Sequence, residues 1–191
     1  MRIEQDVLQT LDTSVSAKRK AHILGVAQTA KELAGQYGVD PQQAYLAGLL
    51  HDLARGLPGE QAIQQAKTYA IPVDAYALAH PEILHGPIAA AWAHERWNIK
   101  DQSLLRAVSQ HTLGGVPMDT LSRILYLSDA IEPNRDYPEV ESLRTLAHKD
   151  LRAAVCASME QSVAYLRNRR LTPHPTTLAA LKALKNEEES E

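Results

Sequence analysis

Apolar residues recur every three or four positions along almost the whole chain, and this spacing constrains the fold more than any other feature. In the segment 16–38 the apolar positions that share one helical face are Ile23, Val26, Ala27, Ala30, Leu33 and Ala34. No stretch shows the strict apolar and polar alternation of a half-buried strand. The pattern therefore predicts an all-α protein.

Start and stop signals divide the chain into expected helices. Asp40 as an N-cap and Pro41 at the first helical position predict a helix over 40–56 that stops at Gly56. Further helices are expected over 58–71, 87–98, 100–112, 118–133, most of 138–170, and 173–185, with a broken segment over 73–87. We expect one domain over 1–191 with its core at about 14–170, and an acidic tail, 186–191, that is solvated and frayed.

Charge and cysteine content exclude several classes of protein. The formal net charge of −3 gives no general attraction to nucleic acid or to a membrane surface. Cys156 is the one cysteine, which excludes an internal disulfide and a cysteine zinc cluster and fits a reducing compartment. No apolar run approaches the ~20 residues of a membrane span, and the first residues lack the apolar block of a signal peptide. We therefore expect a cytoplasmic protein that binds neither nucleic acid nor membrane.

Histidines and aspartates interrupt the apolar faces of several expected helices. His22, His51 and His111 fall at or near inward positions, and Asp52 and Asp129 stand where the pattern calls for apolar residues. One such residue is usually structural, but several on separate helices are costly to bury unless something satisfies them together. A metal centre would do so. Imidazole and carboxylate without thiolate suit iron, manganese, zinc or cobalt.

The wider pattern resembles a known family. His22, the adjacent His51 and Asp52, and the distant Asp129 are similar to the HD superfamily of metal-dependent phosphohydrolases. The stretches that resemble its YqeK family are "RKAHILGV", "AGLLHDLAR", "HPEILHGPIAA", "AVSQHT", "ILYLSDAIEPNRDYP" and "VESLRTLAHKDL". This resemblance implies a compact HD-type helical bundle with a metal centre between helices. It also implies symmetrical hydrolysis of diadenosine tetraphosphate to two ADP, with a dinucleoside polyphosphate as the substrate.

The resemblance also implies a ligand set. The implied metal ligands are His22, His51, Asp52, His85, His111 and Asp129. They would hold two divalent ions, with iron as the usual metal and Asp52 as the bridge. His22, His51 and Asp129 would complete the protein ligands of one ion, and His85 with His111 those of the other. Spacing alone does not choose between His80 and His85. The histidines expected at the surface are His94, His148 and His174.

Hydrolysis of a polyphosphate requires an activated water and cations near the phosphates. Two metal ions with a bridging hydroxide as nucleophile would supply the first, and Asp52 would fix their separation. Arg19 and Arg55 each lie three residues from an implied ligand, and Arg135 follows Asp129; we expect all three to contact phosphate, with Arg55 close to the reaction. Thr112 could donate a hydrogen bond beside His111.

Two other functions remain open on the residues alone. The chain could be an HD phosphohydrolase for a mononucleotide, a cyclic dinucleotide or a guanosine alarmone. It could also be a metal-stabilised module that senses nucleotides without cleaving them. Tyrosine and tryptophan in helices are more often core than base-stacking residues, so the sequence does not identify an adenine site. Oligomeric state is equally unspecified.

Overall fold

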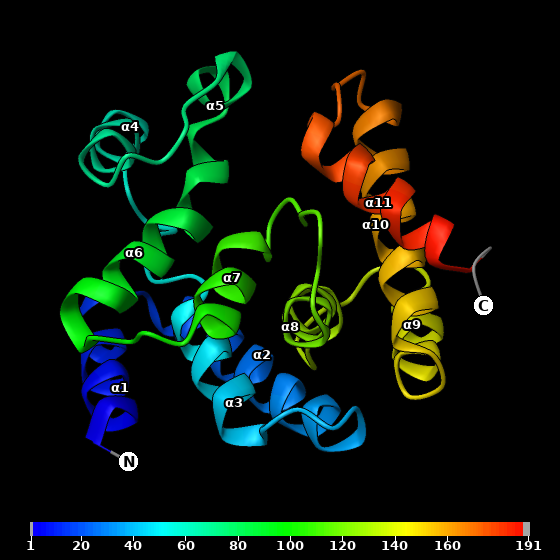
Figure 1. Ribbon diagram of the computed structural model, residues 1–191, viewed down its shortest axis with the longest axis horizontal. Helices are drawn as coiled ribbons and strands as arrows, with labels where there is room; N and C mark the ends of the chain where they lie inside the picture. The colour runs from blue at the N-terminus through cyan, green and yellow to red at the C-terminus, as the bar shows by residue number, and fades with distance from the viewer. Residues whose placement is uncertain (1, 189–191) are drawn as a thin grey trace.

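The computed structural model describes residues 2–188, which form α-helices and one 3-10 helix, with no strand among them (Figure 1). The prediction of an all-α fold is confirmed. The helices are α1 (Arg2–Ser14), α2 (Ala17–Gln36), α3 (Pro41–Leu50), α4 (Gly59–Thr68), α5 (Ala75–Ala79), η1 (Pro81–Leu84), α6 (His85–Trp97), α7 (Gln102–Gln110), α8 (Thr120–Ile131), α9 (Val140–Ala147), α10 (Leu151–Asn168) and α11 (Pro175–Glu188).

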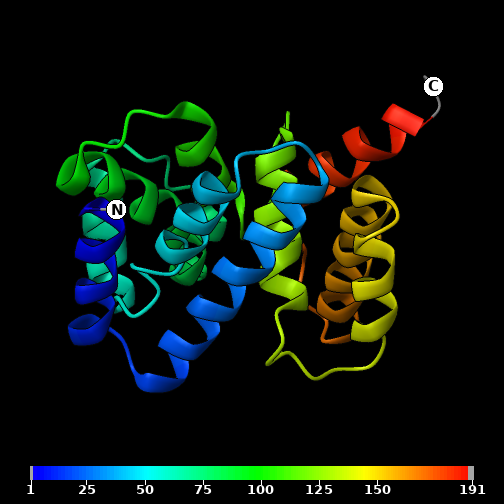
Figure 2. The same cartoon turned by 90° about the horizontal axis from the view of Figure 1, so that it is seen from below.

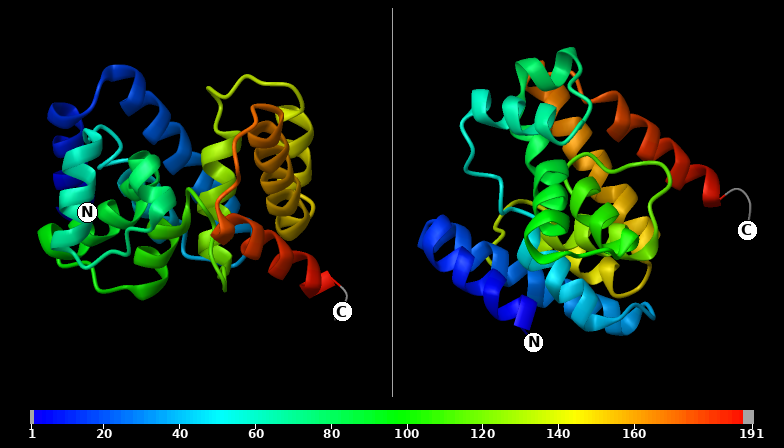
Figure 3. Two further views of the ribbon diagram at one scale, coloured as in Figure 1. Left: turned by 90° about the horizontal axis from the view of Figure 1, so that it is seen from above. Right: turned by 60° about the vertical axis from the view of Figure 1, so that its left-hand side comes forward.

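Helix α8 is the central element. In Figure 1 it is seen almost end-on, with α1–α7 on one side and α9–α11 on the other. Figures 2 and 3 show the same arrangement from other directions. Helices α2 and α7 pack on one flank of α8, and α9 and α10 on the other. The helix is accordingly apolar on most of its surface: Leu121, Ile124, Leu125, Leu127 and Ile131 are all buried.

Helices α2 and α3 pack closely where α3 carries Gly48. A Cβ atom at Gly48 would lie 2.4 Å from the Cα atom of Ala27, so only glycine allows the two backbones to approach this far. The backbone of α2 therefore occupies the space beside Gly48. This contact holds the end of α3 against α2, and both helices carry candidate ligands.

The helix expected over 40–56 ends earlier, at Leu50, and 51–56 form tight turns. In a longer helix the carbonyl of Gly48 would accept a hydrogen bond from the backbone of Asp52. Instead His51 Nδ1 lies 2.6 Å from this carbonyl, and the following bonds join residues three apart, as in Arg55 N to Asp52 O at 3.0 Å. The expectation of a helix to Gly56 was wrong because a side chain competes for a helical carbonyl.

Two expectations near the C-terminus also need correction. The first residues of the acidic tail continue α11, and Glu187 pairs with Arg123 at 2.7 Å; positions 189–191 lie outside the described residues. His174 is buried rather than exposed, with Nε2 3.1 Å from Asp74 Oδ2 and its ring against Tyr76. Among the described residues, no helix has the length and apolarity required to cross a bilayer. The single-domain boundaries remain a prediction.

Candidate metal centre

Five elements bring the candidate ligands to one place beside α8. His22 comes from α2, His51 and Asp52 from the turn after α3, His85 from the start of α6, His111 from the residue after α7, and Asp129 from α8. All six side chains predicted as ligands meet here. His51, Asp52, His85 and His111 are buried.

Asp52 lies at the centre of the cluster. Its Oδ1 is 3.2 Å from His85 Nε2 and 3.9 Å from His111 Nε2. Its Oδ2 is 3.7 Å from the Nε2 atoms of both His22 and His51. One carboxylate thus faces two pairs of imidazoles, with one oxygen toward each pair.

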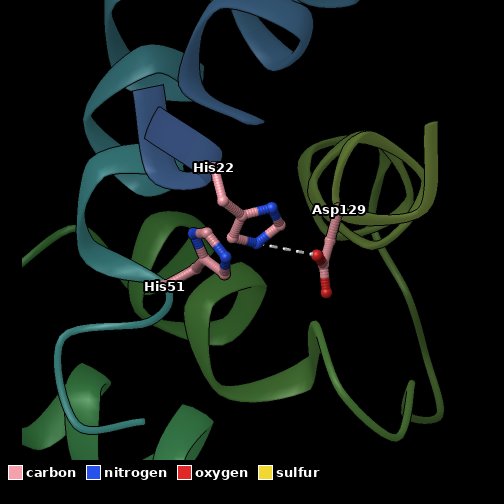
Figure 4. A group of neighbouring side chains, drawn as sticks. All are labelled: His22, His51 and Asp129. Atoms are coloured by element: carbon pink, nitrogen blue, oxygen red, sulfur yellow. Dashed lines mark ion pairs between the residues drawn. The ribbon is translucent and has the colours of Figure 1, made fainter. Parts of the chain in front are cut away.

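Asp129 faces the cluster from α8. Its Oδ1 lies 3.2 Å from His22 Nε2, and His51 is directed toward the same place (Figure 4). One ligand atom from each of these three residues falls within 4.8 Å of the others. This grouping matches the set expected for one ion.

A second group with the same spacing consists of His51, Asp52 and His111. The resemblance placed His85 with His111 on the second ion and His51 on the first. His85 still adjoins this group, because its Nε2 is 2.9 Å from His111 Nε2. The buried His51 is therefore a member of both groups.

The four histidines share one orientation. The Nδ1 atoms of His51, His85 and His111 lie 2.6, 2.5 and 2.8 Å from the backbone carbonyl three residues earlier. The Nδ1 of His22 lies 3.1 Å from Glu132 Oε1. Since a carbonyl or carboxylate oxygen only accepts, each Nδ1 carries a proton, and in the neutral imidazole each Nε2 presents a lone pair to the centre.

These lone pairs fit a bound cation. His85 and His111 bring two Nε2 lone pairs within 2.9 Å of each other, which is repulsive unless a positive charge lies beside both. The single hydroxyl hydrogen of Thr112 can serve only one of them, although its Oγ1 is 3.2 Å from both. His51 Nε2 is buried without a hydrogen-bond partner among the described residues. The donor set therefore fits divalent metal ions.

The electrostatics keep Asp52, Asp129, His51 and His111 in their metal-binding protonation states. His22 differs: burial would lower its pKa, but Asp129 and Glu132 outweigh burial and raise it. Burial would raise the pKa of Asp52, but the imidazoles of His51, His85 and His111 outweigh it and hold the pKa well below its usual range. Burial would likewise raise the pKa of Asp129, but the hydrogen bond with His22, the nearby imidazoles of His51 and His111, and Arg135 lower it. Burial lowers the pKa of His51 and brings that of His111 to about 3.

Three arginines, Arg19, Arg55 and Arg135, line the pocket, which has a volume of about 390 Å³. Arg19 Nη1 lies 2.6 Å from Asp52 Oδ2, and Arg135 Nη2 lies 2.5 Å from Asp129 Oδ1. These arginines, expected to contact phosphate, are paired with the carboxylates themselves. Arg55 lines the pocket and donates to the Glu82 carbonyl at 3.2 Å.

The sequence reasoning missed Glu132, which is 1% exposed. Its Oε2 accepts hydrogen bonds from the backbone N and side-chain Nδ2 of Asn134 at 2.7 and 2.9 Å. A Cβ at Gly25 would lie 2.5 Å from the same oxygen, so this glycine leaves room for the carboxylate. The only signal in the sequence was an acidic residue directly after an apolar helix and before Pro133.

Arg144 and Tyr126 were also missed. Arg144 donates to the carbonyls of Ile131, Glu132 and Arg135 at 2.8–3.0 Å and so holds the segment after α8. Tyr126 lines the pocket, and burial raises its pKa to about 12. His94 and His148 are exposed, as expected.

Comparison with known proteins agrees with this geometry. A family model described as the HD domain matches residues 19–134. The chain is 33% identical to a symmetrical bis(5'-nucleosyl)-tetraphosphatase of Halalkalibacterium halodurans, over 93% of this chain and 94% of that protein. It is 32% identical to the protein of the same name from Bacillus subtilis, over 91% and 92% of the two chains.

A solved structure has the same fold. It is the crystal structure of a predicted HD superfamily hydrolase involved in NAD metabolism from Clostridium acetobutylicum. The TM-score is 0.93 at 32% sequence identity, and the match covers 96% of this chain and 97% of that one. The likeness therefore extends well beyond the metal centre.

Proposed function

The chain belongs to the HD-domain family, in the YqeK branch of symmetrical bis(5'-nucleosyl)-tetraphosphatases, and from this membership we propose that it hydrolyses diadenosine tetraphosphate to two ADP. As a member it is a hydrolase, and the family and the histidine and aspartate cluster both imply a divalent metal. The observation that carries the proposal is the convergence of four imidazole Nε2 atoms on Asp52 and Asp129 in an open, arginine-lined pocket.

Two ions would be held around Asp52 as a shared ligand. His22, His51 and Asp129 would serve one ion, and His85 and His111 the other. We propose iron as the metal, with manganese, cobalt and zinc as candidates that suit the same imidazole and carboxylate donors. Bound ions of this kind lower the pKa of an attacking water and neutralise charge on the phosphoryl oxygens.

The chain's own residues would bind and orient the polyphosphate. The side chains of Arg19 and Arg135 are each 40% exposed, and a guanidinium has five N–H donors, of which the carboxylates use only part. Each arginine can therefore bind a phosphate oxygen while it still contacts its aspartate. Arg55 and the hydroxyl of Thr112 reach the same pocket and would contact neighbouring oxygens.

Symmetrical cleavage requires attack at one of the two central phosphorus atoms. The bond from that phosphorus to the bridging oxygen breaks, and the bridging oxygen leaves with the other ADP. Asp52, held ionised among the imidazoles, would position the ions rather than accept the proton, since a coordinated carboxylate is a poor base. Such a reaction needs no covalent intermediate with the protein.

We also propose that the protein acts in the cytoplasm, on a dinucleoside polyphosphate and not on nucleic acid. The formal net charge of −3 and the single, buried Cys156 support this setting. Metal analysis of protein purified without added metal would identify the native ion.

Product analysis tests the activity directly. Protein loaded with Fe²⁺ or Mn²⁺ is incubated with diadenosine tetraphosphate, and ADP should be the only nucleotide product. AMP together with ATP would mean asymmetric cleavage and would refute the proposal. A mononucleotide, a cyclic dinucleotide and a guanosine alarmone serve as comparison substrates and should be hydrolysed more slowly.

The metal role of Asp52 is tested by Asp52→Asn, which keeps the shape but loses one ligating oxygen and the charge. We expect a loss of activity of at least about 100-fold. The matched control is Asp12→Asn, an exposed aspartate on α1 paired with Lys20, which should keep full activity. Full activity in Asp52→Asn would exclude this role.

A further inference from the structure

A second groove opens directly beside the metal pocket. It has a volume of about 940 Å³ and lies between the segment that follows α8 and one side of α10. Tyr137 and Pro138 line it from the first side, and Gln161 and Tyr165 from α10. Figure 2 shows α8 and α10 side by side, with the segment that leads from α8 to α9 at one end.

The groove is continuous with the metal pocket. Ala130, Arg135, Ser158 and Ser162 line both. The two spaces differ in chemistry, since the walls of the metal pocket are mostly polar and those of the groove mostly apolar. A ligand that spans both would therefore need a charged end and an uncharged end.

One half of a dinucleoside polyphosphate has this division: its phosphates are charged, whereas its purine is flat and uncharged. We propose that the groove binds the adenine of one ADP half, with the ring stacked on Tyr165. This inference rests on the proposed function, since it assigns the base of that substrate to a place. Arg135, which lines both spaces, would lie at the junction between the phosphate chain and the nucleoside.

Tyr165 is suited to stacking because it is unusually accessible. The residue is 56% exposed, although a tyrosine of a helical core is normally buried. The Arg169 guanidinium lies 4.8 Å from the ring centroid, a cation–π contact that holds the ring in place. Gln161 lies on the same helix face and donates from Nε2 to Glu139 Oε2 at 3.0 Å, and its Oε1 and second N–H would face the hydrogen-bonding edge of the base.

A third space borders the metal pocket elsewhere and is less suited to a base. It shares Arg19, His22 and Arg135 with the pocket, and its volume is about 660 Å³. Lys18 and Asp136 are among its lining residues, so its walls carry more charge than those of the groove. The apolar groove is therefore the better site for adenine stacking.

The test compares Tyr165→Ala with Leu78→Ala, a control on α5 that is also 56% exposed and lines none of these spaces. Two inhibitors separate base from phosphate: ADP carries both, and inorganic tripolyphosphate carries phosphate alone. In Tyr165→Ala the KM for diadenosine tetraphosphate and the inhibition constant of ADP should each rise roughly tenfold, the usual effect of losing one stacked base. The kcat and the inhibition constant of tripolyphosphate should not change.

A direct readout uses the fluorescence of etheno-ADP, which is quenched when the modified adenine stacks on an aromatic ring. Quenching should occur with wild type, Leu78→Ala and Tyr165→Phe, and should be lost in Tyr165→Ala. Unchanged ADP inhibition, or equal weakening of ADP and tripolyphosphate, would overturn the groove assignment. If wild type binds etheno-ADP but does not hydrolyse diadenosine tetraphosphate, the proposed function fails while the groove is still tested.

Discussion

Replacing Glu132 by glutamine should weaken metal binding although Glu132 is no ligand. The carboxylate is buried and has two tasks: Oε1 faces His22 Nδ1 at 3.1 Å, and Oε2 accepts two hydrogen bonds from Asn134. A glutamine of the same shape has one oxygen and one NH₂ group, so it can perform only one task.

Of the two amide orientations of this glutamine, the one with its oxygen toward Asn134 keeps more hydrogen bonds than the one with its oxygen toward His22. With its oxygen toward Asn134 it retains both of those bonds, and its NH₂ group then faces His22 Nδ1. Nδ1 must accept, so the proton of His22 moves to Nε2, which can no longer bind a metal. Loss of such an outer partner typically costs about 10- to 100-fold in metal affinity. We expect a loss in this range, about 1.4–2.7 kcal/mol of binding free energy.

The assay is competition between protein and a chelator of known affinity, followed with Mn²⁺ or Zn²⁺ under anaerobic conditions. Glu32→Gln is the matched control, because this glutamate is exposed on α2 and its carboxylate accepts a hydrogen bond from Gln28 rather than from a residue of the metal centre. Thermal unfolding of both metal-free variants shows whether the fold is intact. Wild-type metal affinity in a folded Glu132→Gln protein would refute the tautomer reasoning.

Three further predictions concern stability. Gly48→Ala should destabilise the protein by about 3 kcal/mol in urea unfolding, because the new Cβ would lie 2.4 Å from Ala27 Cα. The control Gly35→Ala, whose new Cβ would have nothing within 4 Å, should be neutral or stabilising. Equal effects of the two substitutions would contradict the packing of α2 against α3. Chelation should lower Tm reversibly, since metal at about 100 times its Kd adds about 2.7 kcal/mol, and an unchanged Tm would exclude a bound ion in the purified protein. The metal-free protein should lose about 1.7 kcal/mol between pH 6.5 and 5, because unfolded His111 takes up a proton near pH 6.5 that folded His111, with its pKa of about 3, does not. The raised pKa of His22 acts in the opposite direction, and constant stability across this range, followed by urea unfolding, would contradict a buried neutral His111.

Helical periodicity predicted most of the fold because burial of one helix face leaves a repeating signal in the sequence. It placed Asp129 within α8 and His22 at the inward edge of α2, whereas the meeting of these two residues followed from the metal-centre hypothesis and the family resemblance. Helix ends were less predictable. The end of α3 at Leu50 depends on the His51 ring taking the Gly48 carbonyl, which has no periodic signature.

Partners at long sequence distance were not predictable from spacing. Glu132 contacts His22 across 110 positions, and the burial of His174 depends on Asp74 across 100 positions. The choice of His85 over His80 came from the family resemblance. His80 is partly exposed and faces Glu82, whereas His85 faces Asp52. The pairing of Arg19 with Asp52 likewise could not be predicted from the sequence and is seen only in the three-dimensional structure.

The backbone carbonyls that orient His51, His85 and His111 make these imidazoles robust to mutation. A carbonyl is present whatever the side chain, and the residues that supply it here are as different as Gly48, Glu82 and Val108. No single substitution removes the orienting group, so these positions can drift in sequence as far as packing permits. His22 is the exception, because its orientation is encoded by one replaceable carboxylate. Loss of metal binding through a change outside the ligand set should therefore concentrate on α2 and the segment after α8.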